Sequence, residues 1–196
     1  MIGTGRNAMG LLEAAAIARP INNIRVYGRN KERLAAFVAT ANGVLDVPVT
    51  GSHDLAEALD ATDIVFVSTD STTPVLSLAD VPGDCLVAGM GVPSEFDDDL
   101  YLGASTVVVA SKDHERGFGD VWHGRLSSSL VDLDASGRLP WDAVIELAQL
   151  IDAAEPARSG VRVFRESSGG YGDIALAAYI YDRAVESGRG QRVRFA

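Results

Sequence analysis

The sequence opens with a glycine-rich turn, and this turn constrains the possible fold more than any other feature. Residues 3–8, GTGRNA, have the G-x-G-x-x-A spacing of the loop that holds a dinucleotide pyrophosphate. The first glycine permits the tight turn, the second lets the backbone approach the phosphates, and Ala8 allows close packing of a helix on a strand. Residues 9–18 form a predicted apolar helix whose free N–H groups would face the phosphates. The predicted cofactor contacts are Gly3, Thr4, Gly5, Arg6 and Asn7.

Strand-like and helix-like segments alternate after this turn. Four short apolar runs rich in β-branched residues read as strands: IRVYG (24–28), DIVFVST (63–69), CLVAGM (85–90) and STVVVAS (105–111). Such continuous runs are typical of parallel strands that helices cover on both faces. A short edge-like strand is expected at VPVT (47–50), with helices over 31–41 and 53–61, the second capped by Ser52.

The second half of the chain is less regular. A loop or short irregular helix is predicted over 112–126, a helix from Pro140 to 154, a strand over 161–164, and a long helix from 171 that stops at Gly188. We therefore predict one α/β domain over residues 1–196, with a doubly wound, mostly parallel Rossmann-type sheet. A returning C-terminal helix and tail would occupy 165–196. Only Met1 and Ile2 precede the glycine turn, so the first, central strand is expected to be truncated.

Composition excludes several classes of partner. The formal net charge is −10, and nucleic acids and membrane surfaces both attract clustered Lys and Arg, so neither partner is expected. The single cysteine, Cys85, lies in an apolar run and is predicted to be a buried, inert thiol. The sequence shows no signal-peptide pattern and no apolar run long enough to span a bilayer, so we expect a cytoplasmic protein.

The end of the second strand informs the choice of cofactor. NAD-binding chains tend to place a carboxylate there to hold the ribose 2′-hydroxyl, whereas this chain has Gly28-Arg29-Asn30. Arg29 offers a planar fork suited to a 2′-phosphate. These residues favour NADP(H) as cofactor, with NAD(H) as the alternative. A second interpretation is that Arg29 is only a solvated residue at the sheet edge.

Two further turns follow strands at the edge where ligands bind in open α/β sheets. The hydroxyl-rich turn STDSTTPVL (68–76) predicts cofactor contacts at Ser68, Thr69, Asp70 and Thr72, although these residues also suit a plain turn and a helix start. In the turn AGMGVP (88–93), small residues leave room for a flat ring, and the predicted contacts are Gly89, Met90 and Gly91. The alternative is again an ordinary turn.

Other polar groups are candidates for catalysis, substrate binding or metal binding. The acidic run EFDDDL (95–100) has no His or Cys nearby in sequence, so no metal is expected. His53 reads as a surface residue, and either His114 or His123 is a candidate general acid or base; no catalytic residue is assigned. Before the last helix, the candidate substrate contacts are Ser167, Ser168, Gly169 and Asp173, the last of which also suits an ordinary capping role.

With these motifs in hand, the chain resembles the ornithine cyclodeaminase and mu-crystallin family. The resemblance runs from MIGTGRNA through VYGRNKERLAAF, DIVFVSTDSTTPVL and EFDDDL to VRVFRESSGGYGDIALAAYIYDRAVESGRG, and so covers nearly the whole chain. It implies that this chain is the Rossmann part of a two-part protein. The family's N-terminal domain, which carries the dimer interface and holds the substrate carboxylate, has no counterpart here, so a missing domain or a homo-oligomer is expected.

The resemblance also implies a reaction. Members of the mu-crystallin type are ketimine reductases that use NADPH, and their arginine at the strand end resembles Arg29. The cyclodeaminases carry a catalytic Asp in a G-D-x-P-G context, near where this chain has Gly91. The leading hypothesis is therefore the dinucleotide-binding portion of an NAD(P)-dependent oxidoreductase that reduces imines or dehydrogenates amino acids. The alternatives are an ornithine cyclodeaminase-type lyase and a non-catalytic dinucleotide- or partner-binding protein.

Overall fold

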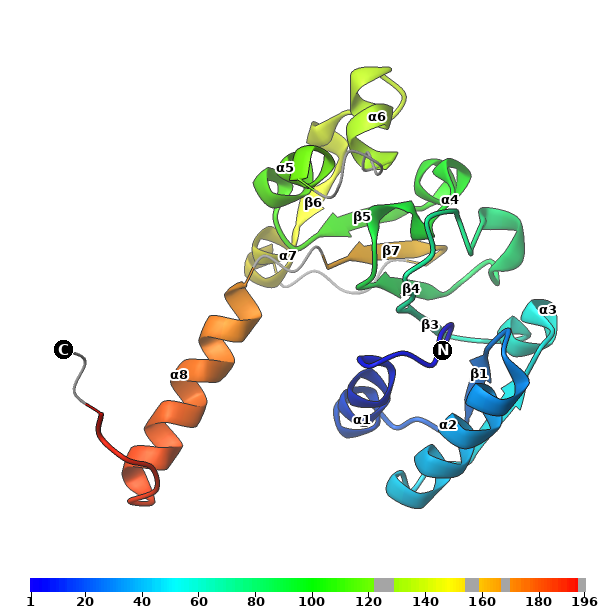
Figure 1. The fold of residues 1–196 in the computed structure, drawn as a ribbon. Coiled ribbons are helices and arrows are strands. Elements are labelled where there is room, and N and C mark those ends of the chain that lie inside the picture. The colour runs from blue at the N-terminus through cyan, green and yellow to red at the C-terminus, as the bar shows by residue number, and fades with distance from the viewer. Residues whose placement is uncertain (122–128, 154–158, 167–169, 194–196) are drawn as a thin grey trace.

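A computed structural model describes residues 1–121, 129–153, 159–166 and 170–193 (Figure 1). The strands are β1 (Ile24–Tyr27), β2 (Val49–Ser52), β3 (Ile64–Val67), β4 (Leu86–Gly89), β5 (Thr106–Val109), β6 (Ile145–Glu146) and β7 (Arg162–Arg165). The α-helices are α1 (Ala8–Ala18), α2 (Lys31–Val44), α3 (Leu55–Leu59), α4 (Asp98–Gly103), α5 (Lys112–Val121), α6 (Ser129–Ala135), α7 (Leu147–Ala153) and α8 (Tyr171–Glu186). Short 3₁₀ turns are η1 (Leu78–Asp80), η2 (Pro93–Glu95) and η3 (Trp141–Ala143).

The strands form a parallel sheet, and the order in which the chain adds strands reverses at Ile2. On one side β1 pairs with β2, and on the other the order is β3-β4-β7-β5-β6. Ile2 joins the two sides, because it forms parallel bridges to Tyr27 of β1 and Val67 of β3. The chain therefore winds outward first in one direction and then in the other, which confirms the predicted doubly wound, Rossmann-type fold. The point of reversal is where such folds bind their ligands.

Burial alternates along the central strands. In β3, β4 and β7 every second residue is fully buried and the others are half-buried. Val65, Val87 and Val163 lie at the centre of the larger apolar core, together with Phe96 and Leu100 from the segment after β4. Cys85 belongs to this core and is fully buried, as predicted. Burial raises the pKa of its thiol, in keeping with an unreactive group.

Three local predictions need correction. Ser52 ends β2 and does not cap α3; Asp54 does, since its carboxylate accepts hydrogen bonds from the N–H groups of Ala56 and Glu57. The segment 112–121, predicted as a loop or irregular helix, is the regular helix α5. The helix expected from Pro140 is instead η3, then β6, then α7, because Ile145 pairs with Val108 of β5. In that segment a tertiary strand pairing overrides the helical spacing of apolar residues.

The first strand is short, as predicted, and consists of little more than Ile2. Its N–H donates to Phe66 at 2.8 Å, and its carbonyl accepts from Ser68 at 3.1 Å. On the β1 side, the Met1 carbonyl accepts from the Tyr27 N–H at 2.8 Å, and the Met1 α-amino group donates to the Arg25 carbonyl at 2.7 Å. A cavity of about 350 Å³ lies beside Met1, between the beginnings of β1 and β3.

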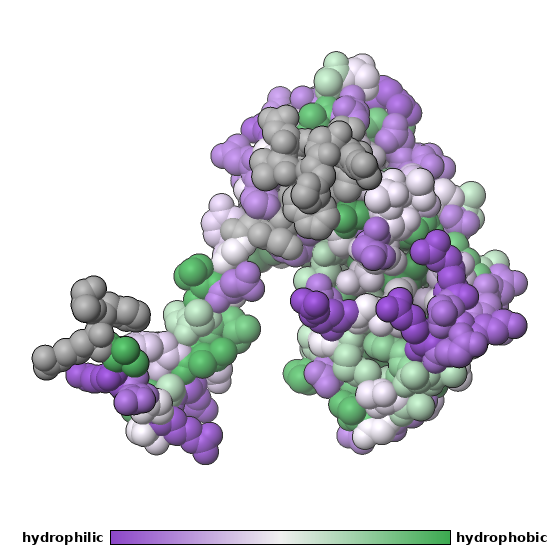
Figure 2. Space-filling view, viewed as in Figure 1, coloured by the Kyte–Doolittle hydropathy of each residue, from purple (hydrophilic) through white to green (hydrophobic). Residues whose placement is uncertain are grey.

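Helix α8 projects away from the sheet (Figure 1). Its apolar side chains are exposed, and Figure 2 shows them as apolar surface along the helix. Ile174 is 73% exposed and Tyr181 67% exposed. Within the described ranges, this helix therefore has an apolar surface that no other element buries. Among the same residues, every helix is too short or too polar to cross a membrane.

Candidate functional site

The glycine turn lies at the point where the strand order reverses. Gly3 has φ of +101°, a conformation that residues with a side chain rarely adopt. A Cβ atom added at Gly3 would lie 2.4 Å from the carbonyl oxygen of Ser68. The turn after Ile2 therefore packs directly on the turn after β3, and only glycine allows this contact. The predicted reason for Gly3, a tight turn, is confirmed by this geometry.

The start of α1 is open toward solvent. Ala8 is fully buried, as its predicted role in close packing requires, whereas Gly5, Arg6 and Asn7 are exposed. Asn7 is the N-cap residue, yet its side chain makes no capping hydrogen bond. The N-terminus of α1 thus presents backbone N–H groups and the positive end of the helix dipole beside the glycine turn. This is the arrangement that binds phosphate in dinucleotide sites.

The turn after β1 lies beside the glycine turn. A Cβ atom added at Gly28 would lie 3.5 Å from the Thr4 methyl group, so the two turns are in contact. Arg29 is exposed at this edge of the sheet. Asn30 caps α2, because its side-chain oxygen accepts from the Arg33 N–H at 2.8 Å. The structure therefore gives Asn30 a structural role besides the predicted cofactor contact, and leaves the Arg29 guanidinium available to a ligand.

The turn after β3 is the third component. Ser68 is 8% exposed, and its carbonyl faces Gly3, whereas Asp70 and Thr72 are exposed. Thr69 is half-buried, and its hydroxyl accepts a hydrogen bond from the Ser71 N–H at 3.2 Å. Ser68 and Thr69 therefore border the glycine turn, and Asp70 and Thr72 lie farther out along the loop.

The predicted residues Gly89, Met90 and Gly91 lie at the end of β4 and in the turn after it. The two glycines are explained by packing against side chains of this chain. A Cβ atom at Gly89 would lie 2.5 Å from the Phe96 ring, and one at Gly91 would lie 2.1 Å from the Glu95 carboxylate. The space on that side of the backbone is filled by these two side chains. Internal packing therefore accounts for both glycines, and the flat ring that the sequence analysis invoked does not have that space.

Two buried charged residues hold these turns and were missed as site residues in the sequence. Arg165, at the end of β7, donates from Nη2 to the Gly91 carbonyl at 3.1 Å and from Nη1 to the Val92 carbonyl at 3.3 Å. Its Nε donates to Glu115 of α5 at 3.0 Å, in an ion pair that solvent hardly reaches. Glu95 accepts from the Thr69 N–H. The alternation of side chains along a strand could have identified Arg165 as buried, because it lies on the same inward face of β7 as Val163.

Burial dominates the electrostatics of Glu95. It raises the pKa of that carboxyl above its ordinary value, and the N–H of Thr69, the Arg165 guanidinium and the N–H of Gly91 oppose the rise. Thr69 follows β3, Gly91 follows β4 and Arg165 ends β7, so the carboxylate links the segment after β3 to the segment after β4. Tyr101 of α4 is also buried in this region, and burial raises the pKa of its phenol.

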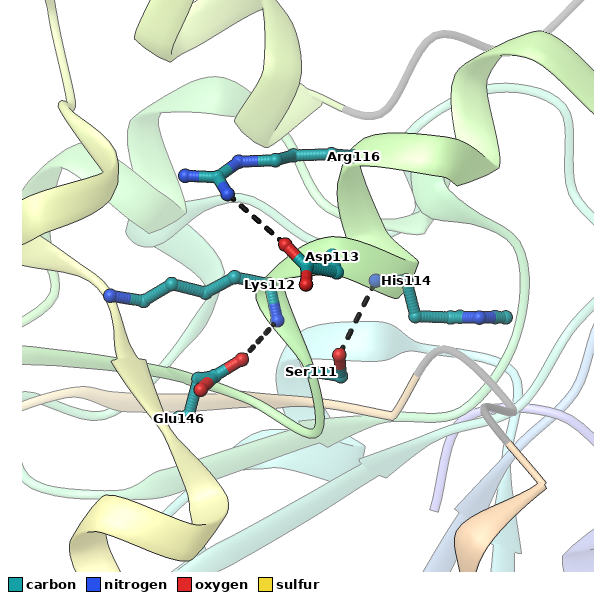
Figure 3. Close-up of polar contacts among 6 residues, drawn as sticks. All are labelled: Ser111, Lys112, Asp113, His114, Arg116 and Glu146. Carbon is teal, nitrogen blue, oxygen red and sulfur yellow. Dashed lines mark hydrogen bonds and ion pairs between the residues drawn. The ribbon is translucent and has the colours of Figure 1, made fainter.

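Two of the three histidines, His53 and His114, lie within the described residues, and they come from different parts of the fold. The ring of His53 is hydrogen-bonded to the Gly28 carbonyl at 2.7 Å and is otherwise exposed. His114 lies in the first turn of α5, where its backbone N–H donates to the Ser111 hydroxyl at 3.3 Å. Figure 3 shows its ring pointing away from Ser111 and Glu146, the latter of which accepts from the Lys112 N–H at 2.7 Å. His123 lies outside the described residues.

The remaining candidates are placed as follows. Ser167, Ser168 and Gly169 lie outside the described residues, and Asp173 is exposed in the first turn of α8. In the acidic run, Asp97 caps α4 and Asp98 pairs with Arg138 at 3.1 Å. The described residues contain no group of three His, Cys, Asp or Glu side chains that could hold a metal ion.

The chain matches proteins of one family along almost its entire length. A sequence model of the ornithine cyclodeaminase/mu-crystallin family matches residues 1–188. A Δ(1)-pyrroline-2-carboxylate reductase of Bacillus thuringiensis subsp. konkukian is 31% identical over 202 residues, an alignment that covers 100% of this chain and 60% of the relative. The chain thus spans about three fifths of the length of the curated relatives it matches.

Solved structures show the same fold. The Δ(1)-pyrroline-2-carboxylate reductase of Thermococcus litoralis, in complex with NADH and L-proline, has a TM-score of 0.84 at 22% identity, covering 98% of this chain and 59% of that one. The iminosuccinate reductase of Paracoccus denitrificans, in complex with NAD⁺, has a TM-score of 0.79 at 22% identity, covering 100% and 59%. At this level of identity the likeness extends to the fold alone.

Proposed function

Because this chain belongs to the ornithine cyclodeaminase/mu-crystallin family, we propose that it forms the dinucleotide-binding part of an NAD(P)-dependent reductase of small imino acids. The observation that carries the proposal is the position of the glycine turn, at the point where the strand order reverses. The turn can pack on Ser68 there because Gly3 has no Cβ atom. Similar proteins named as reductases of cyclic or linear imino acids support the substrate class.

The residues around this turn fit a nicotinamide dinucleotide. The open N-terminus of α1, with Gly5, Arg6 and Asn7 exposed beside it, suits the pyrophosphate. The turn after β1 would receive the adenosine ribose, and the turns after β3 and β4 lie on the opposite side of the glycine turn, where the nicotinamide half would extend. A cofactor bound in this way would span the reversal point of the sheet.

The proposed chemistry is reduction of a C=N bond. When bound, the cofactor supplies a hydride from the nicotinamide to the imine carbon, and a proton added to the nitrogen completes the amine. The residues of this chain would bind and orient the dinucleotide so that one face of the ring meets the substrate. None of them is assigned as the proton donor, and the groups that hold the substrate carboxylate are expected outside this chain.

Direct titration tests the cofactor proposal. NADH or NADPH added to the 196-residue chain should bind with enhanced nicotinamide fluorescence. Oxidation of the bound cofactor after addition of Δ(1)-pyrroline-2-carboxylate, measured by the loss of its near-ultraviolet absorbance, would extend the proposal from binding to turnover. A chain that binds neither cofactor would contradict the proposal.

We further propose that Arg29 selects NADPH over NADH. Its exposed guanidinium at the end of β1 lies where the ribose 2′-phosphate would extend. Replacing Arg29 with alanine should weaken NADPH binding about tenfold, the loss expected for one hydrogen bond between charged groups, and leave NADH binding nearly unchanged. Arg19→Ala, an exposed arginine at the end of α1, is the matched control and should change neither affinity. Equal affinity of the unaltered chain for both cofactors would refute this preference.

The structure gives a reason to set the cyclodeaminase reaction aside. That reaction, as the family resemblance implies, needs an Asp near the position of Gly91. A Cβ atom at Gly91 would lie 2.1 Å from the Glu95 carboxylate, so the Glu95 side chain already fills the space that a second carboxylate would need. The non-catalytic alternative remains as the outcome of the titration in which cofactor binds and no imine is reduced.

A further inference from the structure

The buried charged residues beneath the candidate site are not explained by the packing of the fold alone. Arg165 and Glu95 are both fully buried, and they come from segments 70 positions apart in sequence (165 minus 95). Burying charged side chains is costly unless they are paired and hydrogen-bonded. Such groups are therefore expected to perform a task that an apolar side chain could not.

The polar contacts of Arg165 and Glu95 converge on two turns. Arg165 donates to the carbonyls of Gly91 and Val92, and Glu115 holds the guanidinium from the other side. Glu95 accepts from the Thr69 N–H and lies against Gly91. Gly3 in turn packs on the carbonyl of Ser68, the residue before Thr69. A continuous set of contacts therefore runs from α5 through β7 to the glycine turn.

These two turns lie on one side of the glycine turn only. They follow β3 and β4, whereas the turn at Gly28 and Arg29 follows β1 on the other side. In the proposed function, the first side receives the nicotinamide half of the cofactor and the second receives the adenosine half. The network of Arg165, Glu95 and Glu115 therefore supports only one half of the site.

We propose that Arg165 and Glu95 are positioning residues that fix the turns after β3 and β4, and with them the nicotinamide half of the cofactor. This inference rests on the proposed function. Neither side chain is expected to touch the cofactor, because both are fully buried beneath the turns. Their effect should pass through the backbone. Glu95 fixes the direction of the Thr69 N–H, and Arg165 fixes the direction of the Gly91 carbonyl.

Two variants separate positioning from simple stability. Glu95→Gln keeps the shape and an acceptor for the Thr69 N–H but removes the charge. The double variant Arg165→Met with Glu115→Gln removes both charges of the buried ion pair, and it also removes the guanidinium that stabilises the Glu95 carboxylate. The matched control is Arg162→Met with Asp84→Asn, which removes an ion pair of 2.9 Å from the other end of the same strand.

The readout compares two ligands that share the adenosine half. NADH carries both halves and reports its binding through nicotinamide fluorescence, whereas ADP carries only the adenosine and the two phosphates. Both test variants should raise the dissociation constant of NADH about tenfold and change that of ADP by less than about twofold, and the control should change neither. The enhancement of nicotinamide fluorescence should also fall in the test variants.

The outcomes are distinguishable. Equal weakening of NADH and ADP in the test variants would mean a general structural role and would overturn the inference, as would unchanged NADH binding. A wild-type chain that binds ADP and NADH with the same affinity would also overturn it, since the nicotinamide half would then contribute nothing. Failure of the wild-type chain to bind either ligand would instead refute the proposed function, and the inference with it.

Discussion

Replacing Gly3 with alanine should lower the free energy of unfolding by about 3 kcal/mol and remove most of the affinity for dinucleotide. Two effects add at this position. The backbone has φ of +101°, which strains any residue with a side chain, and the new Cβ would lie 2.4 Å from the carbonyl oxygen of Ser68. A backbone atom cannot move aside as a flexible side chain would, so the turn itself must shift. Chemical denaturation and fluorescence titration with NADH measure the two losses.

Gly10 provides the matched control for this variant. It lies in α1, seven residues farther along the chain, and a Cβ atom there would meet no heavy atom within 4 Å. Gly10→Ala should therefore raise the free energy of unfolding by about 0.5–1 kcal/mol, because alanine favours the helix, and leave dinucleotide binding unchanged. If the two variants behaved alike, the contact between Gly3 and Ser68 would not be the reason for the glycine.

The second large effect concerns a polypeptide that begins with a free amine at Met1: its stability should depend on pH through that amine. The α-amino group of Met1 is buried, and burial, assisted by the positive charge of Arg25, lowers its pKa from 8.0 to about 5. In the unfolded chain the amine binds a proton below pH 8, whereas in the folded chain it does so only below about pH 5. Between these values the unfolded state holds more protons, so stability should rise with pH.

The size of this effect follows from the shift. Three pKa units correspond to about 4 kcal/mol, a cost that is fully present below pH 5 and absent above pH 8. N-terminal acetylation removes the charge and should abolish this part of the dependence.

Urea denaturation of the unmodified and acetylated chains at pH 5 and pH 8 checks this expectation. The other titrating groups are common to both chains, so the difference between the two slopes isolates the amine. Acetylation should stabilise the chain strongly at pH 5 and weakly at pH 8. Parallel pH profiles would show that the amine reaches solvent in the folded state.

Much of the fold was predictable from local sequence. Every long apolar run became a strand of the sheet, and the glycine turn gave the position of the strand reversal, because both signals depend on neighbouring residues alone. The segment after Pro140 was mispredicted because β6 exists only through its pairing with β5. Ser52 looked like a cap, yet Asp54 is two residues closer to the helix and its carboxylate reaches two N–H groups.

The loops of the candidate site were predictable from the sequence, whereas the buried side chains that hold these loops were not. The glycine turn adjoins Ser68 through Gly3 and Gly28 through Thr4, as expected, since strand ends in a parallel sheet share one edge. The glycines after β4 were assigned to the ligand, whereas Phe96 and Glu95 explain them, because those contacts depend on how the following 3₁₀ turn folds back. Arg165 was invisible for a related reason: the partners of a buried arginine lie on segments that only the tertiary structure brings together.

The place of β7 has a consequence for how the chain reaches its native state. Among the described residues, 162–165 form the last strand in sequence, yet this strand lies between β4 and β5 and pairs with residues 86–89 and 106–109. During synthesis, the facing edges of β4 and β5 must wait, with unpaired backbone groups, until this late segment emerges from the ribosome. Contacts so distant in sequence slow folding, and open strand edges invite association between nascent chains. The segment that delivers Arg165 beneath the turns is thus also the one that completes the sheet.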